Sequence, residues 1–153
     1  MAAPAPANDP ELLAFVQEYW AARLPHSAIY QLVLSDAKFT HASKGVVRAR
    51  VTLTKNHVNS HGGIHGSTSA TFFDWVGGMA IAAWDKRSKT GVSTDIHVTY
   101  QSSAREGDEV EIEGTTTKVG GTLAFTKCCI YKVVDGERGA VIADGSHTKF
   151  VKV

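Results

Sequence analysis

The stretch from Asn59 to Trp84, NSHGGIHGSTSATFFDWVGGMAIAAW, consists of two parts of different character. Its beginning is rich in glycine and histidine, and the rest is small or apolar almost throughout. The Gly-Ser-Thr run at 66–68 marks the start of a helix, and the polar run at 85–88 marks its end. A helix that is apolar on all sides is buried on all sides. We therefore predict a long central helix over residues 65–84.

Segments with strand character surround this helix. They alternate in polarity or are rich in β-branched residues, and they cover residues 30–40, 45–54, 91–104, 108–119, 121–135 and 139–153. Turn signals of hairpin type stand at 107–108, 120–121 and 135–136. Strands and helices do not alternate, which disfavours a doubly wound parallel sheet. The sequence predicts an α+β fold, with one curved antiparallel sheet of about six strands and the long helix against its concave face.

An extra helix is predicted near the N-terminus. Asn8 or Asp9 can cap it, Pro10 suits its first turn, and apolar residues recur at helical spacing until Pro25 ends it. Residues 1–9, rich in alanine and proline, are expected to form a flexible tail. Residues 10–153 have the size of a single domain.

Composition narrows the class of protein. Of the 153 residues, 43% are hydrophobic and 20% are charged, a globular balance that disfavours disorder. The net charge of +1 offers no basic surface for nucleic acid. No apolar run reaches the roughly 18 residues that span a bilayer, and the N-terminus has no apolar signal core. We expect a cytoplasmic protein, and a mitochondrial location stays open.

The two cysteines, Cys128 and Cys129, are adjacent on a predicted strand. Neighbours on a strand point to opposite faces, so these two are poorly placed to form a disulfide with each other. Their spacing is not that of zinc ligands. Two small apolar residues in a reducing compartment are the favoured interpretation.

Asp74 is the exception within the apolar helix. It lies about two turns inside the helix, too far to cap it, and no lysine or arginine stands three or four residues away. An unpaired carboxylate at an apolar site resists ionisation and can act as a base near neutral pH. From the residues alone, a functional carboxylate and a structural one are equally supported.

The turn before the helix offers a second candidate group. Glycines at 62, 63 and 66 allow close approach of a ligand, and the first backbone N–H groups of the helix, near Gly66, suit a developing oxyanion. Gly66 and Asp74 are eight residues apart, or roughly 12 Å along a helix. Whether both can act on one substrate is left open by this geometry.

Four motifs in order, Asn59…HGGIHG…Asp74, GVSTDIHVTY, KVGGTLAFT and ADGSHTKF, resemble the hotdog acyl-coenzyme A thioesterases. The resemblance covers roughly residues 30–151 and includes both the small animal enzymes and the bacterial phenylacetate-degradation type. It implies a single hotdog thioesterase domain in which the sheet wraps the helix.

The resemblance also implies roles for individual residues. The Gly66 N–H and the Asn59 side chain polarise the thioester carbonyl, and Asp74 activates water or attacks the carbonyl directly. Ser93, contributed by the partner subunit, holds the water, so the site lies between two chains. His65 is expected to brace the loop or line the site.

Further positions match the part of the family site that binds coenzyme A. A glycine turn with a lysine makes a small anion site, and the resemblance assigns the nucleotide to this hairpin. The ligand-binding candidates are Lys118, Val119, Gly120, Gly121, Thr122 and Leu123, together with Lys55, Asp95, Tyr100 and His147.

The sequence departs from the family pattern at Ser67, where a glycine is usual. The earlier His61-Gly62-Gly63 allows a second register, with Gly62 as the donor; we prefer Gly66 because the spacing to Asp74 then fits. His57, His61 and His65 are spaced by four, but the glycines oppose a helix there, and we expect no metal.

The predicted function is hydrolysis of a medium- or long-chain fatty or an aryl acyl-coenzyme A to free acid and coenzyme A. Coenzyme A is part of the substrate, so no cofactor is expected. The resemblance implies a homodimer with shared active sites, assembled into a homotetramer. The alternatives are a hotdog hydratase or dehydratase acting on acyl thioesters, and a non-catalytic module that binds acyl-coenzyme A.

Overall fold

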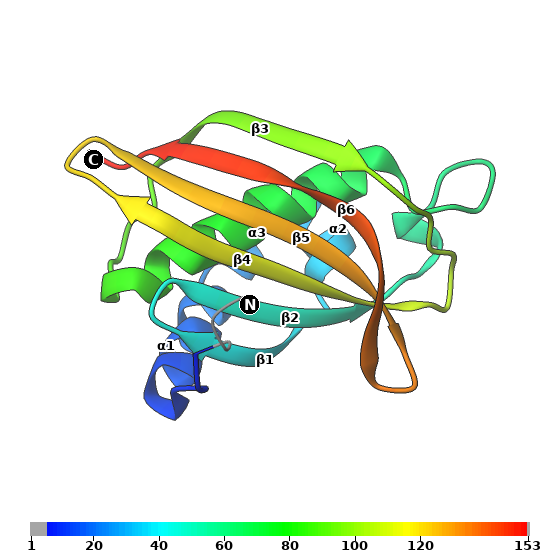
Figure 1. The fold of residues 1–153 in the computed structure, drawn as a ribbon, viewed down its shortest axis with the longest axis horizontal. Coiled ribbons are helices and arrows are strands. Elements are labelled where there is room, and N and C mark those ends of the chain that lie inside the picture. The colour runs from blue at the N-terminus through cyan, green and yellow to red at the C-terminus, as the bar shows by residue number, and fades with distance from the viewer. Residues whose placement is uncertain (1–5, 153) are drawn as a thin grey trace, which may run out of the picture.

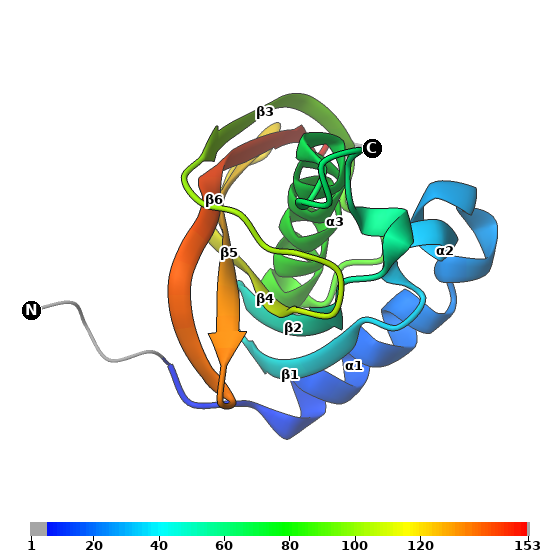
Figure 2. The same cartoon turned by 90° about the vertical axis from the view of Figure 1, so that its right-hand side faces the viewer.

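Six antiparallel strands form one sheet that curls around a long helix, as Figure 1 and Figure 2 show. The computed structural model describes residues 6–152. In chain order the elements are α1 (Pro10–Ala21), the 3₁₀ turn η1 (Leu24–His26), α2 (Ala28–Leu34), β1 (Lys38–Ser43), β2 (Val46–Thr52), the 3₁₀ turn η2 (Lys55–His57), α3 (Gly66–Asp85), β3 (Val92–Tyr100), β4 (Glu109–Val119), β5 (Leu123–Val134) and β6 (Glu137–Phe150). The predicted α+β hotdog arrangement is confirmed.

The strands lie in the order β1-β2-β4-β5-β6-β3. Asp135 and Gly136 both have positive φ and form the tight β5–β6 turn that their sequence predicts. The turn signal at 107–108 does not form a hairpin between β3 and β4, because β3 crosses the sheet and pairs with β6 instead. As a result, β3 is an edge strand.

The long helix α3 fills the concave face of the sheet, and its predicted bounds are correct to one residue. Phe72 and Phe73 on α3 are fully buried, as are Ile112 and Ile130 on the strands below them. At Gly114 on β4 an added Cβ would lie 2.6 Å from a backbone oxygen of α3. The helix therefore rests directly on the sheet backbone, which fixes where each helical side chain emerges.

The N-terminal helix α1 begins as predicted. The Asp9 carboxylate accepts the backbone N–H groups of Glu11 and Leu12 at 3.0 and 3.1 Å. The helix ends at Ala21, not at Pro25, which instead lies in the short turn η1. Of the predicted flexible tail, residues 1–5 lie outside the described residues, whereas Asn8 accepts the Ala42 N–H at 3.0 Å.

The strand predicted over residues 30–40 is wrong in its first half. Residues 28–34 form helix α2, and β1 begins only at Lys38. Ser27 caps this helix by accepting the Tyr30 N–H, and Val33 and Leu34 are buried. Tyr30, Val33 and Leu34 are spaced as on one face of a helix. An apolar run as short as this one fits a strand equally well, so periodicity alone could not identify the helix. The correction places Tyr30 beside α3.

Candidate active site

Asp74 lies on the side of α3 that the sheet leaves uncovered. Figure 2 shows the sheet curving around α3 from β3 to β1, with α1 and α2 beyond β1. Between α2 and β3 an open groove of about 470 Å³ remains over α3. Its lining residues are Ser27, Ile29, Tyr30, Ala70, Thr71, Asp74 and Ile96. The Asp74 side chain is 34% exposed, so the carboxylate can meet a ligand in this groove.

Two hydroxyl groups hold the two oxygens of this carboxylate. Tyr30 donates its phenolic hydrogen to Oδ2, and Ser93 Oγ donates to Oδ1 at 3.0 Å. Asp74 is therefore not the unpaired carboxylate that its neighbours in the sequence suggest. Hydroxyl donors fix its orientation, and it forms no ion pair with lysine or arginine among the described residues.

His147 continues this chain of hydrogen bonds. Its Nε2 lies 2.8 Å from Ser93 Oγ and 3.8 Å from Asp74 Oδ1. The imidazole is fully buried, and burial, reinforced by the nearby Lys149 charge, lowers the pKa of His147 to about 4. Because Ser93 has one hydrogen and gives it to Asp74, His147 donates from Nε2 to Ser93. The Nδ1 atom is buried and has no hydrogen-bond partner among the described residues.

The serine reaches Asp74 within one chain, whereas the resemblance implies a serine from the partner subunit. Helix α3 and strand β3 are adjacent, and the backbone of β3 is irregular between Ser93 and Asp95, where the pairing with β6 shifts. Such an irregularity re-aims a side chain at the sheet edge. Asp74, Ser93 and His147 therefore form one cluster, named here the acid cluster.

A second group of predicted residues gathers at the start of α3. Asn59 Oδ1 accepts the backbone N–H groups of His61 and Gly63 at 2.9 and 3.2 Å. Because Oδ1 is occupied in this way, the Nδ2 hydrogens are the groups of this amide that can bind a further acceptor. His65 caps α3, with Nδ1 accepting the Ser67 N–H at 3.0 Å. We name Asn59, His65 and Gly66 the donor cluster.

The donor at Gly66 is the first backbone N–H of α3, and it has no acceptor among the described residues. Tyr100 packs over Gly66 and donates its hydroxyl hydrogen to the Gly66 carbonyl at 3.0 Å. Tyr100 is thus close to the donor cluster, far along β3 from Ser93. Gly62 N–H, the alternative donor, is occupied by the Asn59 carbonyl at 2.9 Å.

The remaining predicted residues lie apart from both clusters. The hairpin Lys118–Leu123 joins β4 to β5 near Val151, at the end of the sheet where β3 begins. Lys55 is exposed in η2, and Asp95 is exposed on β3 two residues after Ser93. In one chain the acid cluster lies between the donor cluster and the hairpin.

Sequence reasoning missed two residues next to Asp74. Tyr30 was not identified because its segment was predicted to be a strand, which would not place it beside Asp74. Lys149 is buried on β6 and lines, with Tyr30 and Asp74, a smaller cavity of about 100 Å³. Burial lowers the pKa of Lys149, and the Asp74 charge raises it in part. Its position two residues after His147, on the same strand face, is a signal that could have identified it.

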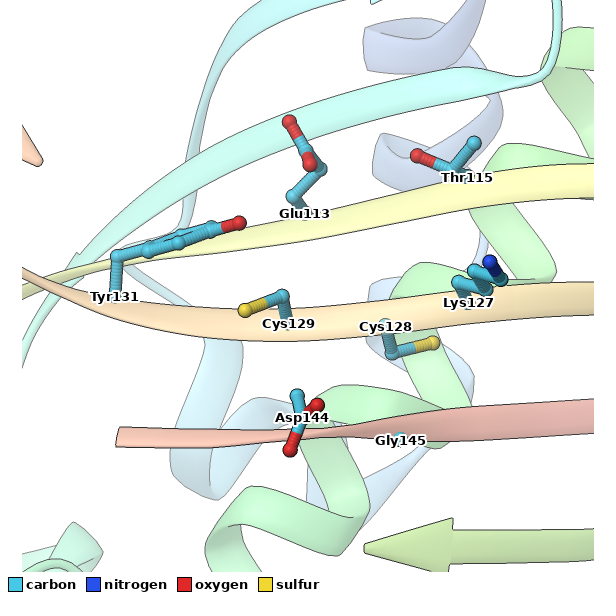
Figure 3. Close-up of a pocket in the computed structure, with 8 residues that line it drawn as sticks. All are labelled: Glu113, Thr115, Lys127, Cys128, Cys129, Tyr131, Asp144 and Gly145. Carbon is cyan, nitrogen blue, oxygen red and sulfur yellow. The ribbon is translucent and has the colours of Figure 1, made fainter. Parts of the chain in front are cut away.

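Another hollow, of about 320 Å³, lies on the opposite face of the sheet (Figure 3). Glu113, Cys129 and Asp144 pair across three strands there, and Tyr131 borders them. Cys128 is buried toward α3, so the two thiols face opposite sides as predicted, and both are free. Burial raises the pKa of the Cys129 thiol, and no base is bonded to it among the described residues. This hollow is separated from Asp74 by the sheet.

The described residues include no group of three or more histidine, cysteine, aspartate or glutamate side chains arranged to hold a metal ion. His57 is instead a structural residue: it is buried, its Nε2 bonds the Val33 carbonyl at 2.8 Å, and its Nδ1 accepts the Thr54 N–H. Among helices within residues 6–152, none is long and apolar enough to cross a membrane.

Proteins similar to this chain in sequence and structure include several thioesterases. The family described as "Thioesterase superfamily" matches residues 61–138. Acyl-coenzyme A thioesterase 13 of Homo sapiens is 33% identical over 120 residues, which cover 78% of this chain and 83% of that protein. The crystal structure of thioesterase superfamily member 2 from Mus musculus is 26% identical, covers 91% of this chain and 96% of its own, and has a TM-score of 0.78. A Streptococcus mutans protein bound to acetyl-CoA shares the fold at 21% identity, with a TM-score of 0.66 over 78% of this chain and 90% of its own.

Proposed function

Because the chain belongs to the thioesterase superfamily and is a thioester hydrolase, we propose that it cleaves fatty acyl-coenzyme A of medium or long chain length, or an aryl acyl-coenzyme A, with Asp74 as the catalytic carboxylate. One observation carries the assignment of Asp74. Its carboxylate is held between two hydroxyl donors at the floor of an open groove. A carboxylate fixed in this way and open to solvent can take a proton from water or attack an acyl carbon.

In the proposed reaction, the thioester carbonyl oxygen accepts hydrogen bonds from the Gly66 N–H and Asn59 Nδ2. Water attacks the carbonyl carbon while Asp74 takes its proton, and the negative charge that develops on oxygen is stabilised by the two donors. The intermediate then collapses, the carbon–sulfur bond breaks, and the coenzyme A thiolate leaves and takes up the proton. In the alternative, Asp74 attacks first and water hydrolyses the resulting anhydride.

The two clusters must come from different protomers to meet one substrate. Gly66 and Asp74 are eight residues apart on a straight helix, roughly 12 Å along its axis. A partner placed antiparallel across the groove would bring its donor cluster to this chain's acid cluster. The edge strand β3 favours such a partner, because it exposes Val92, Ile96 and Tyr100 and an unpaired backbone edge. We propose a homodimer, and by family analogy a homotetramer.

The coenzyme A end of the substrate is proposed to lie near the hairpin Lys118–Leu123. Its exposed lysine and glycine turn can hold a phosphate. Lys55 is a further phosphate candidate, and Asp95 and Tyr100 are candidates to line the ligand. The reaction consumes only water beside the thioester, so it needs no cofactor. A cytoplasmic location is part of the proposal.

The test is a panel of acyl-coenzyme A chain lengths and one aryl thioester, followed by thiol release, for wild type and Asp74→Asn. We expect thiol release by wild type and a loss of kcat of at least about a hundredfold in Asp74→Asn, because the amide cannot take a proton. Near wild-type turnover in Asp74→Asn would refute the mechanism. Conversion of an enoyl thioester without thiol release would favour a hydratase, and binding without any turnover would favour a carrier.

A further inference from the structure

Tyr30 on α2 touches Asp74 on the oxygen that Ser93 leaves free. Its hydroxyl donates to Oδ2, while Ser93 Oγ donates to Oδ1. The two carboxylate oxygens therefore differ in their surroundings. Oδ1 faces Ser93 and His147. Oδ2 accepts the hydrogen of a phenol that borders both the open groove and the smaller inner cavity.

The Tyr30 ring is held in place by aromatic packing from two other helices. Its centroid lies 5.5 Å from that of Trp20 on α1, and Trp20 lies 5.2 Å from Trp75 on α3. The helix that carries Tyr30 is anchored by the cap from Ser27 and by buried Val33. The hydroxyl therefore meets the carboxylate from a fixed direction.

This phenol is a permanent donor. Burial raises the pKa of Tyr30, and the hydrogen bond to Asp74 and the carboxylate charge raise it further. Tyr30 consequently stays protonated and remains a donor. A hydrogen bond donated to a carboxylate favours its charged form.

We propose that Tyr30 is a positioning residue for the reaction, which holds Oδ2 of Asp74 and favours the ionised carboxylate. This inference rests on the proposed role of Asp74. It adds a residue from α2 to the site.

The test is Tyr30→Phe, which removes the hydroxyl and keeps the ring. We expect kcat to fall roughly tenfold with KM little changed, and the acidic limb of the pH–rate profile to move to higher pH by about one unit. The direction follows because loss of a donor makes protonation of the carboxylate easier. Tyr19→Phe is the matched control. Tyr19 is also buried and lines the inner cavity, but its hydroxyl bonds no described residue, and this variant should keep the wild-type profile.

A second variant reverses the sign of the effect. Difluorotyrosine placed at position 30 keeps the hydroxyl and makes it a stronger donor, so the acidic limb should move to lower pH. The other titratable groups near Asp74 are unchanged in both variants. They are His147 and Lys149 on β6, Cys128 on β5, and Arg23 beside the inner cavity.

The possible outcomes distinguish a failure of this inference from a failure of the proposed function. If Asp74→Asn is inactive but the acidic limb is the same in Tyr30→Phe, difluorotyrosine and wild-type enzyme, Tyr30 has no such role and the proposed function stands. If Asp74→Asn keeps wild-type turnover, the proposed function and this inference both fail. Shifts of opposite sign in the two Tyr30 variants, with Tyr19→Phe unmoved, support the inference.

Discussion

The imidazole of His147 lies against the bare backbone of Gly77, where an added Cβ would stand 2.5 Å from Nδ1 and 3.0 Å from Thr126 Oγ1. Real Cβ atoms do not approach neighbours this closely. The absence of a side chain at Gly77 therefore lets β6 bring His147 beneath Ser93, and the hydrogen-bonded chain to Asp74 depends on it.

Gly77→Ala should consequently displace His147. We expect a loss of about 1–3 kcal/mol in the free energy of unfolding, from overpacking, and at least about a tenfold loss of kcat from disturbed hydrogen bonding. Gly78→Ala is the control, because its added Cβ would have no neighbour nearer than 3.5 Å. Chemical denaturation should show Gly78→Ala at least as stable as wild type. Equal stability of the two alanine variants would contradict the close approach.

Ser93→Ala removes the hydroxyl between His147 and Asp74. We expect kcat to fall about ten- to hundredfold, since a displaced catalytic group costs rate steeply. The free energy of unfolding should fall by about 1–3 kcal/mol, because buried His147 loses the acceptor of its Nε2 hydrogen. Thr94→Ala is the matched control. Thr94 is the next residue on β3, and its hydroxyl donates to the Thr148 carbonyl, away from Asp74. Steady-state kinetics in which both variants lose rate equally would argue against a special place for Ser93.

His147 should make the stability of the protein fall in mild acid. Burial lowers the pKa of His147 to about 4, from the ordinary value of 6.5 that it has in the unfolded chain. Between these values only the unfolded chain takes up the proton, so stability is full above pH 6.5 and is lost as the pH falls toward 4. From pH 7 to pH 5 the loss is about 2 kcal/mol.

The measurement is urea unfolding at both pH values for wild type and His147→Gln. Glutamine keeps an amide donor near Ser93 but does not titrate, so this variant should lose less stability over the interval. The exposed His61→Gln serves as the control and should keep the wild-type pH dependence. His41, also buried with a pKa lowered by burial, contributes equally in all three proteins and cancels in the comparison. The same slope in wild type and His147→Gln would exclude His147 as its source.

Mixed dimers test whether the site is shared between protomers. Asn59→Ala and Asp74→Asn lie in different clusters, so a mixed dimer has one site with both defects and one intact site. Subunit exchange between these two inactive variants should restore about a quarter of wild-type activity, if the proposed two-fold symmetry holds. No recovery would place both clusters in one chain's site.

The same experiment with Asp74→Asn and Ser93→Ala should restore nothing. These residues are bonded within one chain, so every site in the mixed dimer keeps a defect. Recovery here would mean that the working serine comes from the partner subunit after all.

The sequence predicted the parts of the fold that depend on periodicity. A long apolar helix and six strands follow from it because burial on one or all faces leaves a repeating pattern. The helix over residues 28–34 was not predicted, because the periodicity of seven residues is too short to distinguish a helix from a strand. Asp74 stood out as the one charge in an apolar helix, whereas His147 and Ser93 required resemblance, since single polar residues on strands are common. The role of Tyr30 could not be predicted, because Tyr30 and Asp74 lie on different helices and are 44 positions apart in the sequence.

The distance along α3 between the donor cluster and the acid cluster has a consequence for how the protein must be assayed. If each working centre is completed by a neighbour, a solitary chain is inactive however well folded it is. Specific activity should then decline as the protein is diluted below the dissociation constant of the dimer, and it should return on concentration.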